Sequence, residues 1–291
     1  MRRRFSPNGR LLGILLAVLA AVFASSAGVL VRQVDASDAW TLLAYRSLGF
    51  VATVLLFIVI CNGRATLRRF NAIGREGIAV ALSLGAAFIA FLLALVVTNV
   101  ATVVAVLGAA PMVAGLLGWA FIGEKPSKAT WLAMLAAILG VSLIAWSDLG
   151  SGSAPGLGLA VLACLGYAAA IVGLRAGSAR DMSPAICLSG VFAGLVSVTL
   201  ADSLVAETDV VLVGLLLGSV QIGAQYILLT IATRFAPASD VALAMVLELV
   251  LAPLWVWAFV GEAAPQVVLL GGGIVATAVI FNAIASDKAT R

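Results

Sequence analysis

Apolar runs of about 20 residues, separated by short polar stretches, recur along the whole chain. A helix of about 20 residues crosses the roughly 30 Å hydrocarbon core of a bilayer. A lone segment in lipid satisfies its backbone hydrogen bonds only as a helix, whereas a β-barrel would show short alternating segments. We therefore expect an all-α polytopic membrane protein with ten transmembrane helices. They are predicted near Leu11–Val31, Trp40–Ile60, Gly77–Val97, Val100–Ile122, Thr130–Ser147, Pro155–Leu174, Pro184–Leu204, Val210–Thr233, Ser239–Val260 and Val267–Ala285.

Composition and charge agree with this pattern, because 63% of the 291 residues are apolar and only 10% are charged. With the amino terminus inside, the predicted cytoplasmic segments hold 15 of the 17 basic residues, and only Arg32 and Arg46 lie elsewhere. The predicted outer loops carry mostly acidic residues. By the positive-inside rule we expect a multi-pass protein of the cytoplasmic (inner) membrane with both termini cytoplasmic. Since the basic residues mark topology, we expect no nucleic-acid partner.

Several kinds of chemistry are excluded or disfavoured. The chain has no histidine, which removes imidazole general bases and most zinc sites. Cys61, Cys164 and Cys187 lie in apolar stretches, at spacings that fit neither a metal motif nor a disulfide framework. No G-x-x-x-x-G-K-[ST] sequence is present, and no predicted cytoplasmic loop could house an ATPase domain. We expect no enzyme activity, no cofactor and no metal.

The two halves of the chain carry related sequences. Leu16–Ala20 recurs as Leu159–Ala163, and Trp119–Glu124 (Trp-Ala-Phe-Ile-Gly-Glu) recurs as Trp257–Glu262 (Trp-Ala-Phe-Val-Gly-Glu). The second match falls in the fourth predicted helix of each half. We therefore expect two five-helix repeats, residues 1–149 and 150–291, in one membrane unit. Because five is odd, the second repeat is inverted, and inverted repeats are typical of alternating-access transporters with a site near the midplane.

A further set of residues resembles a known family. It comprises Arg46 near the start of the second predicted helix, the run from Pro111 to Glu124, and residues 232–239 followed by Glu248, Gly261 and Glu262. With its 5+5 arrangement the chain resembles the drug/metabolite transporter superfamily, and within it the EamA-type ten-helix branch. The resemblance implies a central cavity lined by the first four helices of each repeat, with the fifth and tenth outside. That family usually has a proline directly after the ninth-helix glutamate, where this chain has Leu249, so we expect the kink to be displaced by about a turn.

Pro111 and Pro253 are the two prolines inside predicted helices, in the repeat-related fourth and ninth. A mid-helix proline frees a carbonyl group and bends the helix. Interruptions in corresponding helices of two repeats point towards a binding site. We treat both prolines as hinge or kink candidates, with kinks that only improve packing as the alternative.

Glu248 is the only acidic residue deep inside a predicted helix. An unpaired carboxylate there costs roughly 3 kcal/mol on insertion scales, so we expect it to be protonated, paired or facing a wet cavity. It is a candidate for proton coupling or for binding a cationic substrate, and a structural acid that ties helices together is the alternative. Arg46 could hold a substrate carboxylate, pair with Glu248, or snorkel to the outer headgroups.

Gln221 and Gln225 lie four residues apart and share one face of the eighth predicted helix. Lipid would tolerate this polar face poorly, so we expect it to face the cavity, with interhelical hydrogen bonds as the alternative. The remaining polar candidates are Tyr226 beside them, Tyr45 beside Arg46, and Ser25 and Ser26 on the first predicted helix.

Glycines at four-residue spacing are expected to let helices approach closely. Gly190 with Gly194, and Gly214 with Gly218, form such pairs. The run Gly271–Gly273 gives the tenth predicted helix a flat face that could contact another protomer. A homodimer through the tenth helix is therefore one expectation.

Together these features predict a secondary transporter that moves a small polar organic metabolite, an amino acid or similar, across the cytoplasmic membrane by alternating access. We expect an exporter, driven by gradients because no nucleotide-binding motif is present. A channel-like facilitator or a lipid-linked substrate flippase of the same fold is the alternative. The expected partners are the solute and the lipid bilayer.

Overall fold

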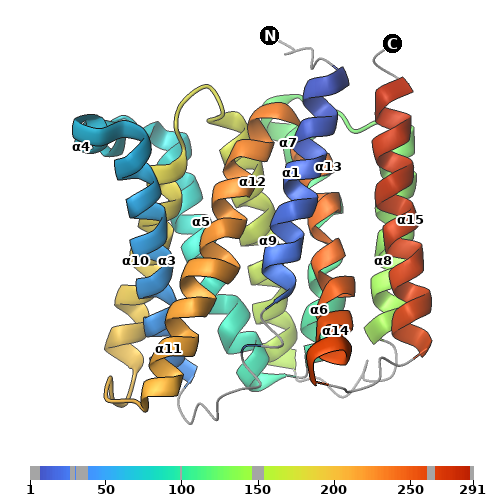
Figure 1. Ribbon diagram of the computed structural model, residues 1–291. Helices are drawn as coiled ribbons and strands as arrows, with labels where there is room; N and C mark the ends of the chain where they lie inside the picture. Colours follow the sequence, from blue (N-terminus) through green and yellow to red (C-terminus); the bar gives the residue numbers. More distant parts are fainter. Residues whose placement is uncertain are drawn as a thin grey trace.

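The computed structural model describes residues 7–26, 30, 39–98, 100–145, 154–260 and 266–288. Every regular element in these ranges is helical (Figure 1). The elements are α1 (Pro7–Ser25), α3 (Ala39–Asn62), η1 (Gly63–Ala65), α4 (Thr66–Asn71), α5 (Gly74–Val97), α6 (Val100–Leu107), α7 (Ala110–Ile122), α8 (Lys128–Ala145), α9 (Ala154–Ala176), α10 (Ser183–Leu200), α11 (Thr208–Leu216), η3 (Leu217–Gly223), α12 (Ala224–Phe235), α13 (Ala238–Met245), α14 (Leu247–Val260) and α15 (Gln266–Lys288).

Seven helices in the described ranges are long and apolar enough to cross a membrane, judged by length and composition. They are Ala39–Asn71, Gly74–Ala94, Ala105–Ile122, Ala154–Ala176, Ser183–Leu200, Thr208–Phe235 and Ala238–Phe259. Three more apolar helices are shorter in the described part of the chain: Gly9–Ser25, Lys128–Leu143 and Leu269–Ala285. The all-helical prediction is confirmed, and ten membrane spans stay a prediction.

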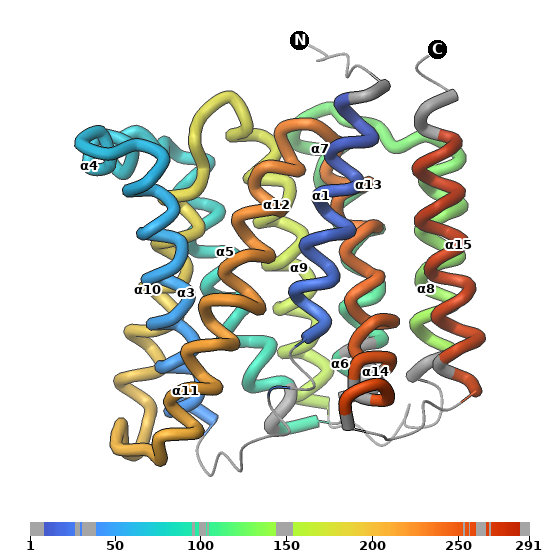
Figure 2. Tube along the Cα trace, viewed as in Figure 1, coloured from blue at the N-terminus to red at the C-terminus, as the bar shows by residue number. Residues whose placement is uncertain are grey.

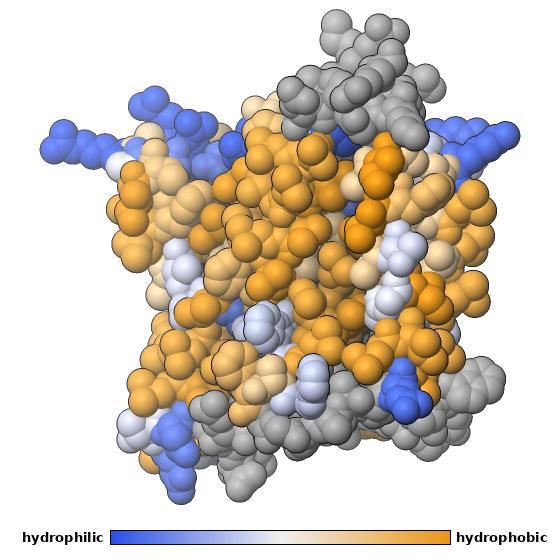
Figure 3. Space-filling model, turned by 45° about the vertical axis from the view of Figure 1, so that its right-hand side comes forward, coloured by the Kyte–Doolittle hydropathy of each residue, from blue (hydrophilic) through white to orange (hydrophobic). Residues whose placement is uncertain are grey.

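The helices stand side by side as an upright bundle (Figure 2). We call the end where α1 begins and α15 ends the terminal end, at the top of Figure 1, and the other end the distal end. Apolar side chains cover the middle of the face seen in Figure 3, and hydrophilic ones gather at its upper and lower margins. Leu56, Leu139 and Leu270 are at least 60% exposed on the outside of the bundle. Such a surface suits lipid tails better than water.

Small residues bring the helices into close contact, as the glycine spacing predicts. A side chain at Gly190 or Gly194 would meet Phe50 or Ser47 of α3. A Cβ at Gly218 would overlap the backbone carbonyl oxygen of Arg46, and one at Gly214 would crowd Tyr45. These contacts fix α3 between α10 on one side and the α11–η3 segment on the other.

The fourth and ninth predicted helices are both interrupted, as expected. A proline lies next to the first break but not next to the second. The first break, at Gly108 and Ala109, separates α6 from α7, and Pro111 stands in the first turn of α7, where proline loses no hydrogen bond. The second break, at Val246, separates α13 from α14. It precedes Glu248, and Pro253 lies further along, inside α14, where a kink stays a prediction.

The two breaks nevertheless correspond to one another in the sequence. The offset of 138 residues that relates Trp119 to Trp257 also relates Gly108 to Val246. The eighth predicted helix holds a third irregularity, because its middle part η3 is a π-helix. Such wide turns are rare and often lie at functional sites.

The tenth helix, α15, packs against α8 at the edge of the bundle (Figure 1). Its glycine run serves this packing in part, since a side chain at Gly140 of α8 would meet the backbone oxygen of Gly271. A side chain at Gly272 would meet Val250 of α14 instead. A Cβ at Gly273, in contrast to one at Gly272, would meet nothing within 4 Å.

We predict that Gly218→Ala lowers the thermal stability of the purified protein. The added methyl group would overlap the backbone of Arg46, and overpacking of this kind costs about 1–3 kcal/mol. The matched control is Gly273→Ala, where a Cβ meets nothing within 4 Å. Melting curves in detergent should show a lower midpoint for Gly218→Ala alone, and equal midpoints for both variants would contradict the packing role.

Candidate functional site

A cavity of about 220 Å³ lies inside the bundle. One water needs roughly 10–15 Å³ of such space, so the cavity has room for a small organic molecule with water. Its polar lining consists of Ser25, Arg46, Tyr167, Gln221, Gln225, Tyr226 and Glu248. Both halves of the chain contribute to it. None of the lining residues belongs to α8 or α15, and none belongs to α10, which the resemblance had placed at the cavity.

Arg46 reaches this cavity from α3. Its Nη2 donates a hydrogen bond to Oε1 of Gln221 at 3.2 Å, and Nε2 of Gln221 donates to the carbonyl oxygen of Ala24 at 3.0 Å. Gln221 is therefore held by α1 so that its oxygen faces the guanidinium. Nε of Arg46 is buried without a hydrogen-bond partner in the described part of the chain. Arg46 thus faces the interior, which corrects the alternative in which it snorkels to the headgroups.

Glu248 lies across the cavity, in the first turn of α14. The break at Val246 creates this helix start, whose unpaired N–H groups and dipole favour a carboxylate. No ion pair within 4.0 Å joins Glu248 to Arg46 among the described side chains, although the two interact electrostatically. In the same ranges no group of three or more His, Cys, Asp or Glu side chains could hold a metal ion.

Two tyrosines stand close enough to Glu248 to interact with it electrostatically. Tyr226 also packs edge-to-face with Phe50 and Phe88, with ring centroids 5.4–5.8 Å apart. The hydroxyl of Tyr167 on α9 is buried and has no hydrogen-bond partner in the described residues. Sequence reasoning missed Tyr167, although it is one of only three tyrosines in the chain and lies mid-way along a predicted span.

Five of the predicted site residues line the cavity: Glu248, Arg46, Gln221, Gln225 and Tyr226. Tyr45 does not, since its hydroxyl donates to the carbonyl oxygen of Leu204 at 2.7 Å at the distal end. Ser26 does not either, since it donates to the carbonyl of Phe23. Ser25 takes its place in the lining and accepts a hydrogen bond from Nε1 of Trp255 at 2.9 Å. No sequence signal had distinguished Trp255.

The cavity ends part-way through the bundle. On its side towards the terminal end lie the ring of Phe50 and the fully buried side chains of Ala168, Ile171 and Leu229. Residues at the distal ends of α1 and α5, such as Ser25 and Phe91, belong to the lining. The cavity therefore occupies the middle and distal part of the bundle, and packed side chains separate it from the terminal end.

Comparison with known proteins agrees with this arrangement. The model of the EamA-like transporter family matches residues 11–146. This match places the chain in the drug/metabolite transporter superfamily. EamA-like proteins are transporters and not enzymes, and the apolar helices of this EamA-like chain make it a multi-pass membrane protein.

The fold of this EamA-like chain is also found among solved structures, whereas no curated protein matches it. One solved chain, described only as "Crystal structure of protein", has a TM-score of 0.81 and 17% sequence identity to this chain. The similarity covers 96% of this chain and 99% of the solved one. At this identity the likeness concerns the fold alone.

We predict that Gln221→Leu destabilises the protein by about 1–3 kcal/mol, because Arg46 loses its partner inside the bundle. Gln225→Leu is the matched control. Gln225 lines the same cavity one turn later, and no hydrogen bond of its side chain is seen in the described residues. Melting curves in detergent should show a clear loss for Gln221→Leu and a small change for Gln225→Leu. Equal losses would contradict the positioning role of Gln221.

Proposed function

We propose that this protein is a secondary transporter that moves a small polar organic metabolite, an amino acid or similar, across the cytoplasmic membrane by alternating access. Net export is the proposed direction. The observation that carries the proposal is one cavity lined by both Arg46 of the first half and Glu248 of the second half, with no ion pair between them among the described side chains. A cavity that ends part-way through the bundle also suits a carrier better than a continuous pore.

The two opposite charges suit a zwitterionic solute. The guanidinium of Arg46 can hold a carboxylate, and the carboxylate of Glu248 can accept from an ammonium group. Such a solute would leave neither protein charge uncompensated inside the membrane. Phe88, Phe91 and Leu107 give the rest of the cavity an apolar wall for the remaining atoms. A purely cationic solute would be repelled by Arg46.

The packing of the helices supports two inverted five-helix repeats, residues 1–149 and 150–291. In two such repeats, each helix of the first half has a counterpart at the same place in the order of the second half. Helix α9 is then the counterpart of α1, and α12 that of α5, so the contact of α5 with α9 should have an equivalent between α12 and α1, as it does. Helix α14 is the counterpart of α7, and the contact of α7 with α9 likewise has its equivalent between α14 and α1. The breaks at Gly108 and Val246 also lie in corresponding helices of the two halves. Ten membrane spans complete this proposal, with the three shorter apolar helices as the first, fifth and tenth.

Charge supports the proposed orientation, with both termini in the cytoplasm. Arg64, Arg68, Arg69 and Arg75 are exposed at the terminal end, on and beside α4. Basic residues of this kind collect on the cytoplasmic side of membrane proteins. The terminal end would then face the cytoplasm, and the cavity would lie towards the outside.

Glu248→Gln should abolish proton-driven transport while leaving the protein folded, because an amide keeps the shape of the side chain but carries no titratable proton. The probe is the radiolabelled solute with the largest thermal shift in a screen of amino acids, nucleosides, vitamins and organic cations. Uptake into proteoliposomes under an imposed pH gradient should fall to the level of protein-free vesicles. Glu76→Gln, at the surface, is the control, and unchanged pH-dependent uptake by Glu248→Gln would rule out the coupling role.

The orientation has its own test. Reporter domains fused after Gly63 and after Ser178 should report a cytoplasmic location, and one fused after Gly150 should report the outer side. Paired fusions to alkaline phosphatase and to green fluorescent protein measure this, since each is active on one side only. The reverse pattern would overturn both the topology and the inverted repeat.

A further inference from the structure

An ion pair at the terminal end ties three helices together. Arg175, in the last turn of α9, contacts Oε1 of Glu124 through Nη2 at 2.7 Å and through Nε at 2.8 Å. Its Nη1 donates to the carbonyl oxygen of Thr233, in the last turn of α12, at 3.0 Å. The side chain of Arg175 is only 3% exposed. Removing one partner of such a pair leaves the other charge uncompensated, which costs more than breaking a surface pair.

The turn after α7 places Glu124 in this pair. Gly123 has a left-handed backbone with φ +71°, which favours glycine, and it reverses the chain at the helix end. The N–H groups of Gly123 and Glu124 both donate to the carbonyl oxygen of Gly118. Gly123 and Glu124 belong to the Trp-Ala-Phe-Ile-Gly-Glu motif, to which the proposed cavity gives no role. The other carboxylate oxygen of Glu124, Oε2, is buried without a partner in the described residues.

A second buried pair lies at the same end. Nη2 of Arg10, at the start of α1, contacts Oδ2 of Asp240, at the start of α13, at 2.6 Å. The side chain of Asp240 is fully buried and also accepts from Nδ2 of Asn282 of α15 at 3.1 Å. This pair ties α1, α13 and α15 together.

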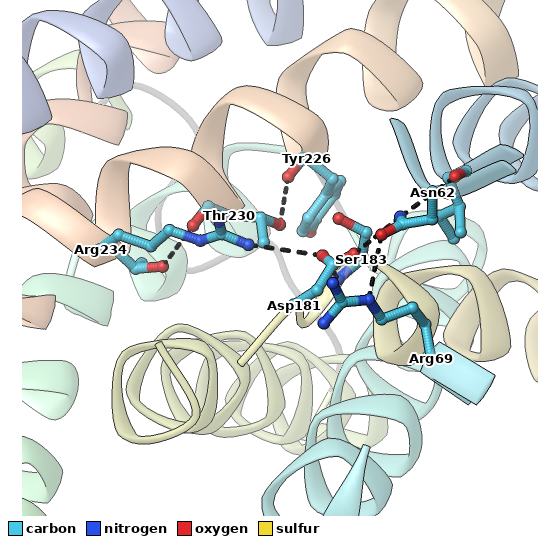
Figure 4. A network of polar contacts seen from close by, with 9 residues as sticks. Asn62, Arg69, Asp181, Ser183, Tyr226, Thr230 and Arg234 are labelled. Atoms are coloured by element: carbon cyan, nitrogen blue, oxygen red, sulfur yellow. Dashed lines mark hydrogen bonds and ion pairs between the residues drawn. The ribbon is translucent and has the colours of Figure 1, made fainter. Parts of the chain in front are cut away.

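A more exposed group of contacts joins the remaining helices of this end. Asp181 accepts from Nδ2 of Asn62 at 3.2 Å and pairs with Arg234 at 3.4 Å, so that it lies between α3 and α12 (Figure 4). Nε of Arg69 in turn donates to Oδ1 of Asn62 at 3.0 Å. Glu76 and Arg180 form a last pair at 3.4 Å, with both side chains about half exposed. Such exposed pairs contribute little.

The Glu124–Arg175 pair closes the column of side chains that leads from the cavity to the terminal end along α9. Tyr167, Ala168, Ile171 and Arg175 follow one another on one face of α9. Tyr167 lines the cavity, Ala168 and Ile171 are fully buried, and Arg175 ends the column. Glu124 follows the end of α7, and Asp240 lies in the first turn of α13. These two segments are the halves of the interrupted helices that lie towards the terminal end. The breaks at Gly108 and Val246 separate both segments from the other halves of the same two helices.

We propose that Glu124–Arg175 and Arg10–Asp240 are the gate at the terminal end, and that both pairs must separate before the cavity opens to that side. This inference rests on the proposed alternating-access cycle and assigns the residues that hold one of its two states. Separation moves α7 away from α9 and α13 away from α1. The partnerless Oε2 of Glu124 makes the closed state less tightly bound than a fully paired carboxylate would.

The test measures cysteine accessibility, so it needs no solute. In a background with Cys61→Ser, Cys164→Ala and Cys187→Ala, two reporters are introduced separately. Ala168→Cys reports on the packed column, and Ala252→Cys reports on the cavity lining towards the distal end. The rate of reaction with a polar maleimide is measured for the purified protein in detergent, with and without Glu124→Gln.

Glu124→Gln should raise the labelling rate at Ala168→Cys about tenfold, as expected for the loss of one charge-assisted hydrogen bond. The rate at Ala252→Cys should fall, because opening one end of an alternating-access carrier closes the other. Arg10→Gln should act in the same direction and provides a second variant if Glu124→Gln does not fold. Glu76→Gln, which removes only the exposed pair, should change neither rate.

Unchanged labelling at Ala168→Cys in every folded gate variant would overturn the proposal. So would a rise at both reporters, which would mean general loosening, or an equal effect of Glu76→Gln. The gate and the coupling role of Glu248 can fail separately. If the labelling assay confirms the gate and Glu248→Gln leaves transport unchanged, the gate stands and the coupling role is rejected.

Discussion

The cost of placing a charge inside an apolar bundle determines how the centre of this protein is built. Arg46 stands within a predicted span, where a bare guanidinium would be strongly unfavourable. Gln221 compensates part of this cost, and Gln221 is oriented in turn by the carbonyl of Ala24. The arrangement requires α3 to touch the α11–η3 segment, which Gly214 of α11 and Gly218 of η3 allow. One buried cation thus fixes the spacing of three helices.

Irregular backbone follows the same constraint. Within a membrane, unpaired backbone groups are tolerated only where they are buried in protein or line a cavity. The breaks between α6 and α7 and between α13 and α14 both adjoin lining residues, Leu107 and Ala110 in one case and Val246 in the other. The π-helical η3 carries Gln221. The positions where the helices lose regularity are therefore the positions that surround the cavity.

The sequence predicted the helical segments and most of the polar lining, because apolar length and isolated polar residues carry strong signals in a membrane protein. Glu248, Gln221 and Arg46 stood out since lipid tolerates none of them cheaply. Tyr167 and Trp255 were missed, because an aromatic side chain is as ordinary in an apolar helix as at a site. The break at Val246 could not be located from the sequence, because no proline or glycine stands at it. Whether Arg46 faced lipid or protein was undecidable without knowing which helix lay beside it.

The residues that line the cavity and the residues that hold the helices together are largely different, which affects how the solute selectivity of this protein could change. Seven polar side chains supply the character of the cavity, while close contacts between small residues supply the frame around it. Gln225 and Tyr167 make no side-chain hydrogen bond within the described residues, so exchanging them would break no hydrogen bond between helices. Single substitutions in the cavity lining can therefore change which solute binds while the contacts between helices stay the same. A chain of this architecture can acquire a different substrate without first losing its ability to fold.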